Sequence, residues 1–160
     1  MDTKHKNPKR KGRSLQRQRA LDVLYEADVR GIAPAGISDL LQERESVSTA
    51  QQPIQSYGIS IVSTFVENAE DVDAFIDAAS PSWSISRMST VDRNILRIGV
   101  TELLYLDVDV AIAAKEVASL AREFSADKSV GFTMGVLNRV SDIHNLETSG
   151  GGFDQEETIA

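Results

Sequence analysis

Residues 110–124 read VAIAAKEVASLAREF, and this stretch decides the fold class. Its apolar residues fall at positions i, i+3, i+4, i+7, i+10, i+11 and i+14, namely Val110, Ala113, Ala114, Val117, Leu120, Ala121 and Phe124. This spacing places all of them on one face of a helix, and the many alanines suit close helix–helix contact. The stretch therefore predicts an amphipathic helix packed against other helices.

Helical periodicity continues through most of the chain. Ser80-Pro81 should end one helix, and Thr90 is expected to cap the start of the next, which is apolar on more than one face, as a central helix is. The sequence predicts an all-α protein, a compact bundle of about seven helices. Besides 110–124, the expected helices cover 14–29, 36–44, a segment from Pro53 to Ala69, a segment from Val72 to Ala79, 91–106 and a last segment with Phe132, Val136, Val140 and Ile143 on one face.

Length and composition exclude several classes of protein. The 160 residues fit one domain with tails, and 41% of them are apolar, which is enough for a core. The chain has no cysteine, so a disulfide scaffold, a cysteine zinc site, an iron–sulfur cluster and thiol catalysis are ruled out. No apolar run approaches the ~20 residues that cross a bilayer, and the start of the chain has no secretory signal. We expect a cytoplasmic protein without membrane association.

Charge is distributed unevenly along the chain. The net charge is −7, yet residues 1–19 contain eight Lys and Arg and one acid. We expect a disordered basic arm over 1–12, a helical domain over 13–147 and a disordered, glycine-rich acidic tail over 148–160. A basic arm on an acidic body usually meets phosphate, anionic lipid or an acidic partner; the alternatives are a solubility tail or a contact with the protein's own acidic body.

The basic segment continues into the first helix. Arg13 and Arg17 are four residues apart, so they share one helix face, and the next residue on that line is the core position Leu21. Because burying a charge is costly, we interpret this pattern as a protruding helix end that presents arginines to phosphate. Gln16 and Gln18 could hydrogen-bond to bases. The alternative is an ordinary solvated helix start.

Patterns typical of enzymes are missing from the sequence. There are two histidines, of which His5 lies in the arm and His144 is expected on the surface. We find no phosphate-binding glycine loop, no nucleophile elbow and no metal-ligand spacing. We therefore expect no enzyme activity, no cofactor and no metal site.

Three blocks of sequence resemble the bacterial transcription antitermination factor NusB, particularly in its actinobacterial style. They are SLQRQRALDVLYEADV at 14–29, VDRNILRIGVTELL at 91–104 and KEVASLAREFSADKSVGFTMGVLNRV at 115–140, and they cover roughly half of the chain. The resemblance implies two small helical bundles. It also implies binding to the boxA element of nascent ribosomal RNA leaders as single-stranded RNA, together with NusE, a small-subunit ribosomal protein, in the complex that helps RNA polymerase resist termination.

The resemblance also implies site residues. Asp92 matches an acidic position associated with NusE contact, and we expect it at the exposed end of its helix. Phe132 would supply the aromatic ring that the arm lacks, although a core position is an equal alternative. Lys128 stands where the family often has an acid, and Lys115 and Met134 also depart from the usual residues. The implied RNA-binding residues are Arg10, Lys11, Arg13, Arg17, Lys128, Ser129 and Phe132.

Other functions remain open at this stage. One is a protein-interaction module whose basic arm folds back on its own body. Another is the NusB-like domain of ribosomal RNA methyltransferases, which would need a downstream catalytic domain. Self-association is also left open, since the family includes dimers. Measuring RNA binding at two salt concentrations distinguishes the hypothesis of RNA binding from that of a protein-interaction module.

Overall fold

The computed structural model describes residues 9–47 and 52–159, and side chains within these ranges up to Ser149. The described chain is all-α, with no strand, which confirms the predicted fold class. Its elements in chain order are α1 (Gly12–Val29), α2 (Pro34–Ser46), α3 (Ser56–Glu67), α4 (Ala69–Ala79), the short 3-10 helix η2 (Ile85–Arg87), α5 (Thr90–Tyr105), α6 (Val110–Phe124) and α7 (Asp127–Ile159).

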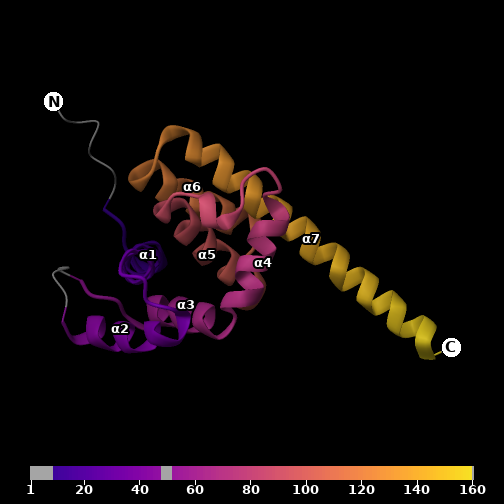
Figure 1. The fold of residues 1–160 in the computed structure, drawn as a ribbon, viewed down its shortest axis with the longest axis horizontal. Coiled ribbons are helices and arrows are strands. Elements are labelled where there is room, and N and C mark those ends of the chain that lie inside the picture. Colours follow the sequence, from indigo (N-terminus) through magenta and orange to yellow (C-terminus); the bar gives the residue numbers. More distant parts are fainter. Residues whose placement is uncertain (1–8, 48–51, 160) are drawn as a thin grey trace.

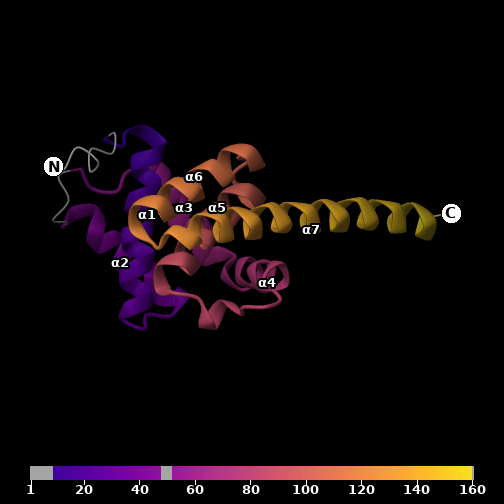
Figure 2. The same ribbon diagram turned by 90° about the horizontal axis from the view of Figure 1, so that it is seen from above.

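The helices form two small bundles that share one core. Helices α1, α2 and α3 pack on one another, and helices α4 to α7 make the second group (Figures 1 and 2). Helix α5 contacts α1, α3, α4, α6 and α7, so it joins the groups. The two expected bundles are therefore present, and the helix that is apolar on several faces is the central one, as predicted.

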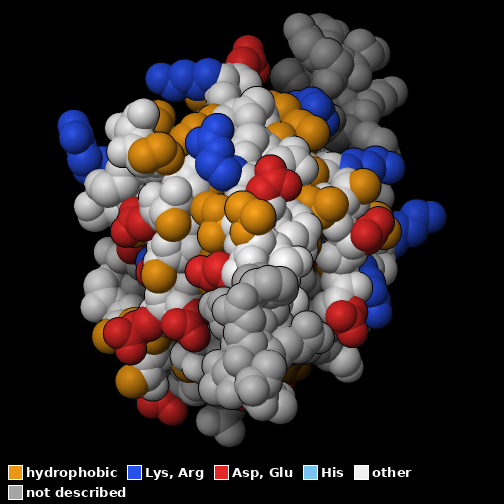
Figure 3. All heavy atoms as spheres, turned by 90° about the vertical axis from the view of Figure 1, so that its right-hand side faces the viewer, with side chains coloured by type: hydrophobic (Ala, Val, Ile, Leu, Met, Phe, Trp, Pro, Cys, Tyr) orange, Lys and Arg blue, Asp and Glu red, His pale blue; other side chains and the backbone are white. Residues whose placement is uncertain are grey.

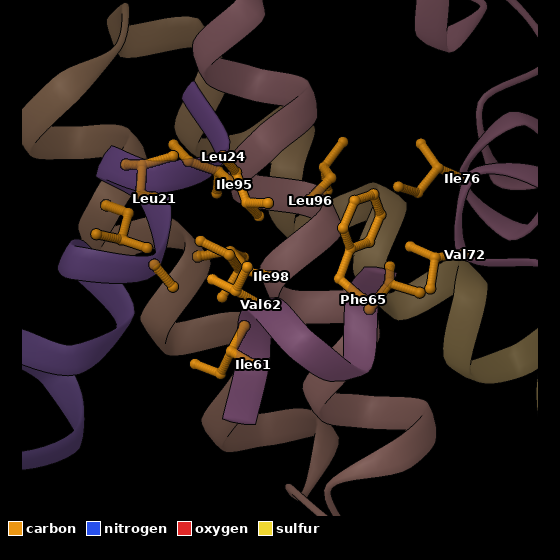
Figure 4. Packing of buried hydrophobic residues seen from close by; sticks show 14 of the residues in the cluster. Leu21, Leu24, Ile61, Val62, Phe65, Val72, Ile76, Ile95, Leu96 and Ile98 are labelled. Atoms are coloured by element: carbon orange, nitrogen blue, oxygen red, sulfur yellow. The ribbon is translucent and has the colours of Figure 1, made fainter. Parts of the chain in front are cut away.

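Buried aliphatic side chains from both bundles meet around α5. Phe65 of α3 lies between the side chains of α4 and those of α5 (Figure 4), and it is 1% exposed. Burying a side chain of this size stabilises the fold by about 1.5–3 kcal/mol. The other core residues labelled in Figure 4 are Leu21, Leu24, Ile61, Val62, Val72, Ile76, Ile95, Leu96 and Ile98.

The stretch that decided the fold class forms α6 with the predicted bounds, and four of its five alanines are buried, the exception being Ala111. Close contact is visible at Gly99 of α5, where an added Cβ would lie 2.5 Å from the Val117 side chain. One member of the predicted apolar face is placed differently. Phe124 is 38% exposed because it is the last residue of the helix and projects beyond the core.

Several predicted boundaries shift by a few residues. Helix α1 starts at Gly12, two residues before the expected start. The cap of α5 is Ser89 and not Thr90, because the Ser89 hydroxyl accepts a hydrogen bond from the backbone N–H of Asp92 at 3.1 Å.

The end of the chain differs from the expected boundary at residue 147. Helix α7 continues to Ile159 and projects away from the bundles (Figure 1). A helix satisfies its own backbone hydrogen bonds, so it can continue past its last packing partner despite the glycines at 150–152. Disorder of 148–160 in solution stays a prediction. On the face around this projecting end, acidic, basic and hydrophobic side chains are mixed (Figure 3).

Candidate nucleic-acid interface

The first turns of α1 carry the exposed positive charges that the sequence analysis singled out. Lys11 has an extended backbone, and Gly12 follows with φ at 57°, a left-handed conformation that favours glycine. This turn leads the chain into the helix, and it leaves the Lys11 and Arg13 side chains exposed. Residues 1–8 of the predicted arm lie outside the described residues.

Arg13 is held against an aromatic ring from another helix. Its guanidinium carbon lies 4.4 Å from the centre of the Tyr57 ring, near the start of α3. A cation over an aromatic face at this distance is stabilised by about 0.5–1 kcal/mol where it is exposed. Arg13 is therefore oriented while it remains accessible to a ligand.

Arg17 is not exposed, and the prediction that it lies on a protruding helix end is wrong. Arg17 is 5% exposed, and its Nε donates to both carboxylate oxygens of Glu102 at 2.8 and 2.9 Å. Glu116 of α6 lies 3.3 Å from the guanidinium. Two carboxylates, and a hydrogen bond that Nε shares between both oxygens of Glu102, compensate for the hydration that the buried Arg17 loses.

Tyr57 belongs to the same network. Its hydroxyl donates a hydrogen bond to Glu102. Burial opposes the charged form of Arg17, but the hydrogen bond and charge of Glu102 outweigh it and raise the pKa of Arg17. Burial together with Glu102 raises the pKa of Tyr57 to about 12. The phenol thus keeps its proton, and the Glu102 carboxylate anchors the ring on which Arg13 rests.

Gln16 also has a structural role where the sequence analysis expected contact with bases. Its side-chain oxygen accepts hydrogen bonds from the backbone N–H groups of Gln55 at 2.7 Å and Gly58 at 3.3 Å. These groups lie at the start of α3, where backbone donors lack partners within the helix. A Cβ at Gly58 would lie 2.6 Å from that oxygen, so glycine permits the close contact between α1 and α3.

Arg10, from the predicted arm, is packed against α6. Its guanidinium donates to Ser14, to Ser119 and to Glu123, each at 2.9 Å. Within the arm that was predicted to be disordered over 1–12, Arg10 thus has defined partners, because an arginine can pair with an acid and hydroxyls without an apolar surface. This is the folding back on the acidic body that the sequence analysis kept as an alternative.

The other implied RNA contacts lie at the start of α7. Lys128 is exposed, whereas Ser129 is 4% exposed and turns inward, donating to Asp92 at 2.8 Å. Ser129 thus has a structural hydrogen bond where an RNA contact was expected. Phe132 is half-buried, and its ring centre lies 5.4 Å from that of Trp83, so it packs at the edge of the core. The open hollow around these two rings has a volume of about 370 Å³.

Asp92 is buried, contrary to the expectation of an exposed position. It is 6% exposed, and its two carboxylate oxygens accept hydrogen bonds from Ser125 at 2.6 Å and Ser129 at 2.8 Å. The carboxylate therefore fastens the turn between α6 and α7 to the start of α5. Its negative charge also lies at a helix N-terminus, where it is favourable.

Two negative findings apply to the parts of the chain that the structure describes. They contain no group of three or more His, Cys, Asp or Glu side chains that could hold a metal ion. They also contain no helix that is both long and apolar enough to cross a membrane.

Comparison with known families identifies the protein's relatives. The model of the NusB family matches residues 14–142, which is most of the chain. The chain belongs to the NusB family. The "Transcription antitermination protein NusB" of Clavibacter sepedonicus is 38% identical over 130 residues, covering 81% of this chain and 95% of the relative. That of Bifidobacterium animalis subsp. lactis is 40% identical over 129 residues, covering 80% and 82%.

Solved structures agree with this assignment. A structure described as antitermination factors NusB and NusE in complex with dsRNA has a TM-score of 0.66 and 28% identity, covering 82% of this chain and 96% of that one. Thermotoga maritima NusB, at 21% identity and a TM-score of 0.66, shows the shared fold. It covers 84% of this chain and 93% of its own.

The NusB match starts at residue 14, so Arg10, Lys11 and Arg13 lie before the matched region. Sequence reasoning found these cations by their charge, but it missed Tyr57 and Arg122, which surround them. Tyr57 lies in a segment that carries only a helical pattern, without a local signal for an arginine partner. Arg122 lies within the block at 115–140, but its place beside the arm depends on how the chain entering α1 passes over α6.

Proposed function

We propose that this NusB-family protein is a non-enzymatic transcription antitermination factor that binds single-stranded boxA-type RNA together with NusE. Two findings support the proposal: the curated relatives carry the name of antitermination proteins, and a related structure is described as NusB with NusE and dsRNA. Within this chain, the observation that carries it is Arg13, an exposed cation held in place over Tyr57 at the start of α1.

The RNA surface in this proposal has an outer and an inner layer. Exposed Lys11, Arg13 and Lys128 would neutralise phosphates, and half-buried Phe132 would offer a ring edge or face to a base. Arg10, Arg17 and Ser129 make internal hydrogen bonds, so in this proposal they hold the surface in shape. A cytoplasmic location, where nascent transcripts are found in bacteria, belongs to the same proposal.

Binding of labelled single-stranded RNA tests this function. Fluorescence anisotropy would compare a boxA-like 12-mer, a scrambled 12-mer and a double-stranded RNA, each with and without NusE, over a range of salt concentrations. Three phosphate contacts should give a log–log salt slope of about −2. We expect tighter binding of the boxA-like strand and a further gain with NusE. No binding of any RNA in either condition would contradict the proposal and favour a protein-interaction module.

For the partner, we propose that NusE docks near the start of α5 and depends on Asp92. Because the carboxylate is buried, its role would be to fix the turn between α6 and α7 and to supply negative charge to a basic ribosomal protein. Titration calorimetry with Asp92→Asn should show weaker NusE binding. Ser125→Ala is the matched control, since it removes one of the same hydrogen bonds and keeps the charge. Equal affinity of Asp92→Asn and the unchanged protein would reject a role for this charge.

A further inference from the structure

A groove lies where the chain entering α1 passes over the second half of α6. The hollow has a volume of about 440 Å³, and a hydrogen bond from Arg10 to Ser119 of α6 holds the entering chain beside it. Its lining contains four positive side chains and one negative side chain. The lining residues are Lys9, Arg10, Lys11, Ser14, Ser119, Arg122 and Glu123.

The charges are arranged as a floor and a rim. Arg10 is at the floor, with its side chain 10% exposed and bonded to Ser14, Ser119 and Glu123. Lys9 and Lys11 are exposed on the α1 side, and Arg122 is exposed on the α6 side. Exposed cations on both rims above a fixed cation suit an extended polyanion better than a compact ligand.

We propose that this groove is a binding path for the phosphodiester backbone of RNA, with Arg122 of α6 as a contact residue. The inference rests on the proposed function and adds a third helix, α6, to an RNA surface that so far involves the starts of α1 and α7. Arg122 is suited to phosphate because its planar guanidinium can donate two parallel hydrogen bonds. The strand would run along the arm and lie between the α1 and α6 rims.

Glu123 is paired with Arg10 in the groove when no RNA is bound. Its carboxylate lies 2.8 Å from the Arg10 guanidinium, so it occupies the position that a phosphate oxygen would take. A strand entering the groove competes with this carboxylate for Arg10. The groove therefore has a built-in competitor, and removing its charge should strengthen RNA binding, which is the opposite of the usual effect of a substitution in a binding site.

Two variants with opposite expected signs test the proposal. With the full chain and the single-stranded 12-mer, Arg122→Ala should weaken binding about threefold and make the log–log salt slope shallower by about 0.7. Glu123→Gln should tighten binding about threefold and steepen the slope by up to about 0.7, because Arg10 becomes available to a phosphate. Circular dichroism melting of each variant checks that the fold is retained.

Charge-matched controls separate local contact from the general field of the protein. Arg30→Ala removes one positive charge at the far end of α1, and Glu67→Gln removes one negative charge at the end of α3. Both controls should leave affinity and slope unchanged. Equal effects of Arg30→Ala and Arg122→Ala would overturn the proposal that RNA binds in the groove, because the overall electrostatic field of the protein would then explain binding.

The outcomes also distinguish this inference from the proposed function. If the unchanged protein binds RNA with a steep salt slope while Arg122→Ala and Glu123→Gln have no effect, the groove is wrong and the proposed function stands. If the unchanged protein binds no RNA, both fail. If Arg122→Ala weakens binding of NusE in the absence of RNA, the groove belongs to the protein partner and the proposal is overturned.

Discussion

Arg13 and Arg17 are one helical turn apart on the same face of α1, yet their surroundings differ completely. Arg17 is buried between carboxylates of α5 and α6, whereas Arg13 is exposed and touches only the face of Tyr57 among the contacts described above. The difference depends on Glu102, which lies 85 residues beyond Arg17 in the sequence. An arginine-rich helix start can therefore divide into an inner turn that holds the fold and an outer turn that remains available to a ligand.

The largest expected effect comes from breaking the inner turn. Arg17→Ala leaves Glu102 buried without its cation, which typically costs 3–5 kcal/mol of unfolding free energy. For a chain of this length that corresponds to a melting temperature lower by about 10 °C. Urea denaturation and melting curves measure it. Combining Arg17→Met with Glu102→Leu should recover most of the loss, and full stability of Arg17→Ala alone would show that the ion pair contributes little.

A smaller loss is expected from disturbing the packing beneath the inner turn. In Gly58→Ala the new methyl group would lie 2.6 Å from the Gln16 oxygen and 2.7 Å from the Ile54 side chain. Such overpacking typically costs about 1–3 kcal/mol in unfolding free energy. Gly131→Ala is the matched control, since its Cβ would meet nothing within 4 Å and alanine favours a helix. Gly58→Ala should melt below the unchanged protein, and Gly131→Ala should not.

The outer turn should affect RNA binding far more than stability. Arg13→Ala should make the salt slope of RNA binding shallower by about 0.7 and weaken affinity about fivefold. Loss of the contact with Tyr57 should lower the melting temperature by only about 1–4 °C. Tyr57→Leu should reproduce part of the affinity loss, and a double-mutant cycle should show that the two effects are not additive. Tyr57→Phe keeps the ring, so its coupling to Arg13 should survive. Additive effects would mean that the ring does not position Arg13.

The half-buried Glu26 of α1, which pairs with Arg44 of α2 and with Arg30, provides a milder comparison with Arg17. Hydrogen bonds from Arg44 and Arg30 lower the pKa of Glu26 from its ordinary 4.5 to about 2. A lowered folded-state pKa gives stabilisation that is complete above pH 4.5 and is lost as the pH falls toward 2. Solvent screening reduces it to about 0.5 kcal/mol. Glu26→Gln should flatten the fall in unfolding free energy between pH 5 and pH 2.5 by this amount, measured by urea denaturation.

No contribution to thermal stability is expected from the projecting end of the chain. Deleting residues 148–160 should leave the melting temperature unchanged, because the predicted tail adds no core packing. The helical circular dichroism signal per residue distinguishes a disordered tail from a continuous helix α7. It should rise on deletion if the tail is disordered, and stay constant if α7 continues as a helix in solution. A lower melting temperature would reveal packing of the tail on the bundles.

The sequence was sufficient for the fold because helical periodicity is local, and α6 shows this most clearly with bounds that match the prediction. The site was less predictable because side-chain partners come from distant segments. Arg17 and Gln16 look like surface residues when α1 is considered alone. The sequence did contain one signal for the buried position of Arg17, namely an acidic residue, Glu102, within the largely apolar helix α5. Glu102 is 1% exposed, and a buried carboxylate needs a cation as its partner.

The hydrogen bonds from the start of α3 to Gln16 also bear on the order in which the protein folds. Gln16 leaves the ribosome before Gln55, 39 residues later in the chain, so the acceptor exists before the donors that need it. The first turn of α3 can therefore be completed as soon as it is synthesised, on a surface that α1 already provides. Helix α3 thus depends on an earlier helix for its first turn, and the two should form and open as one cooperative unit.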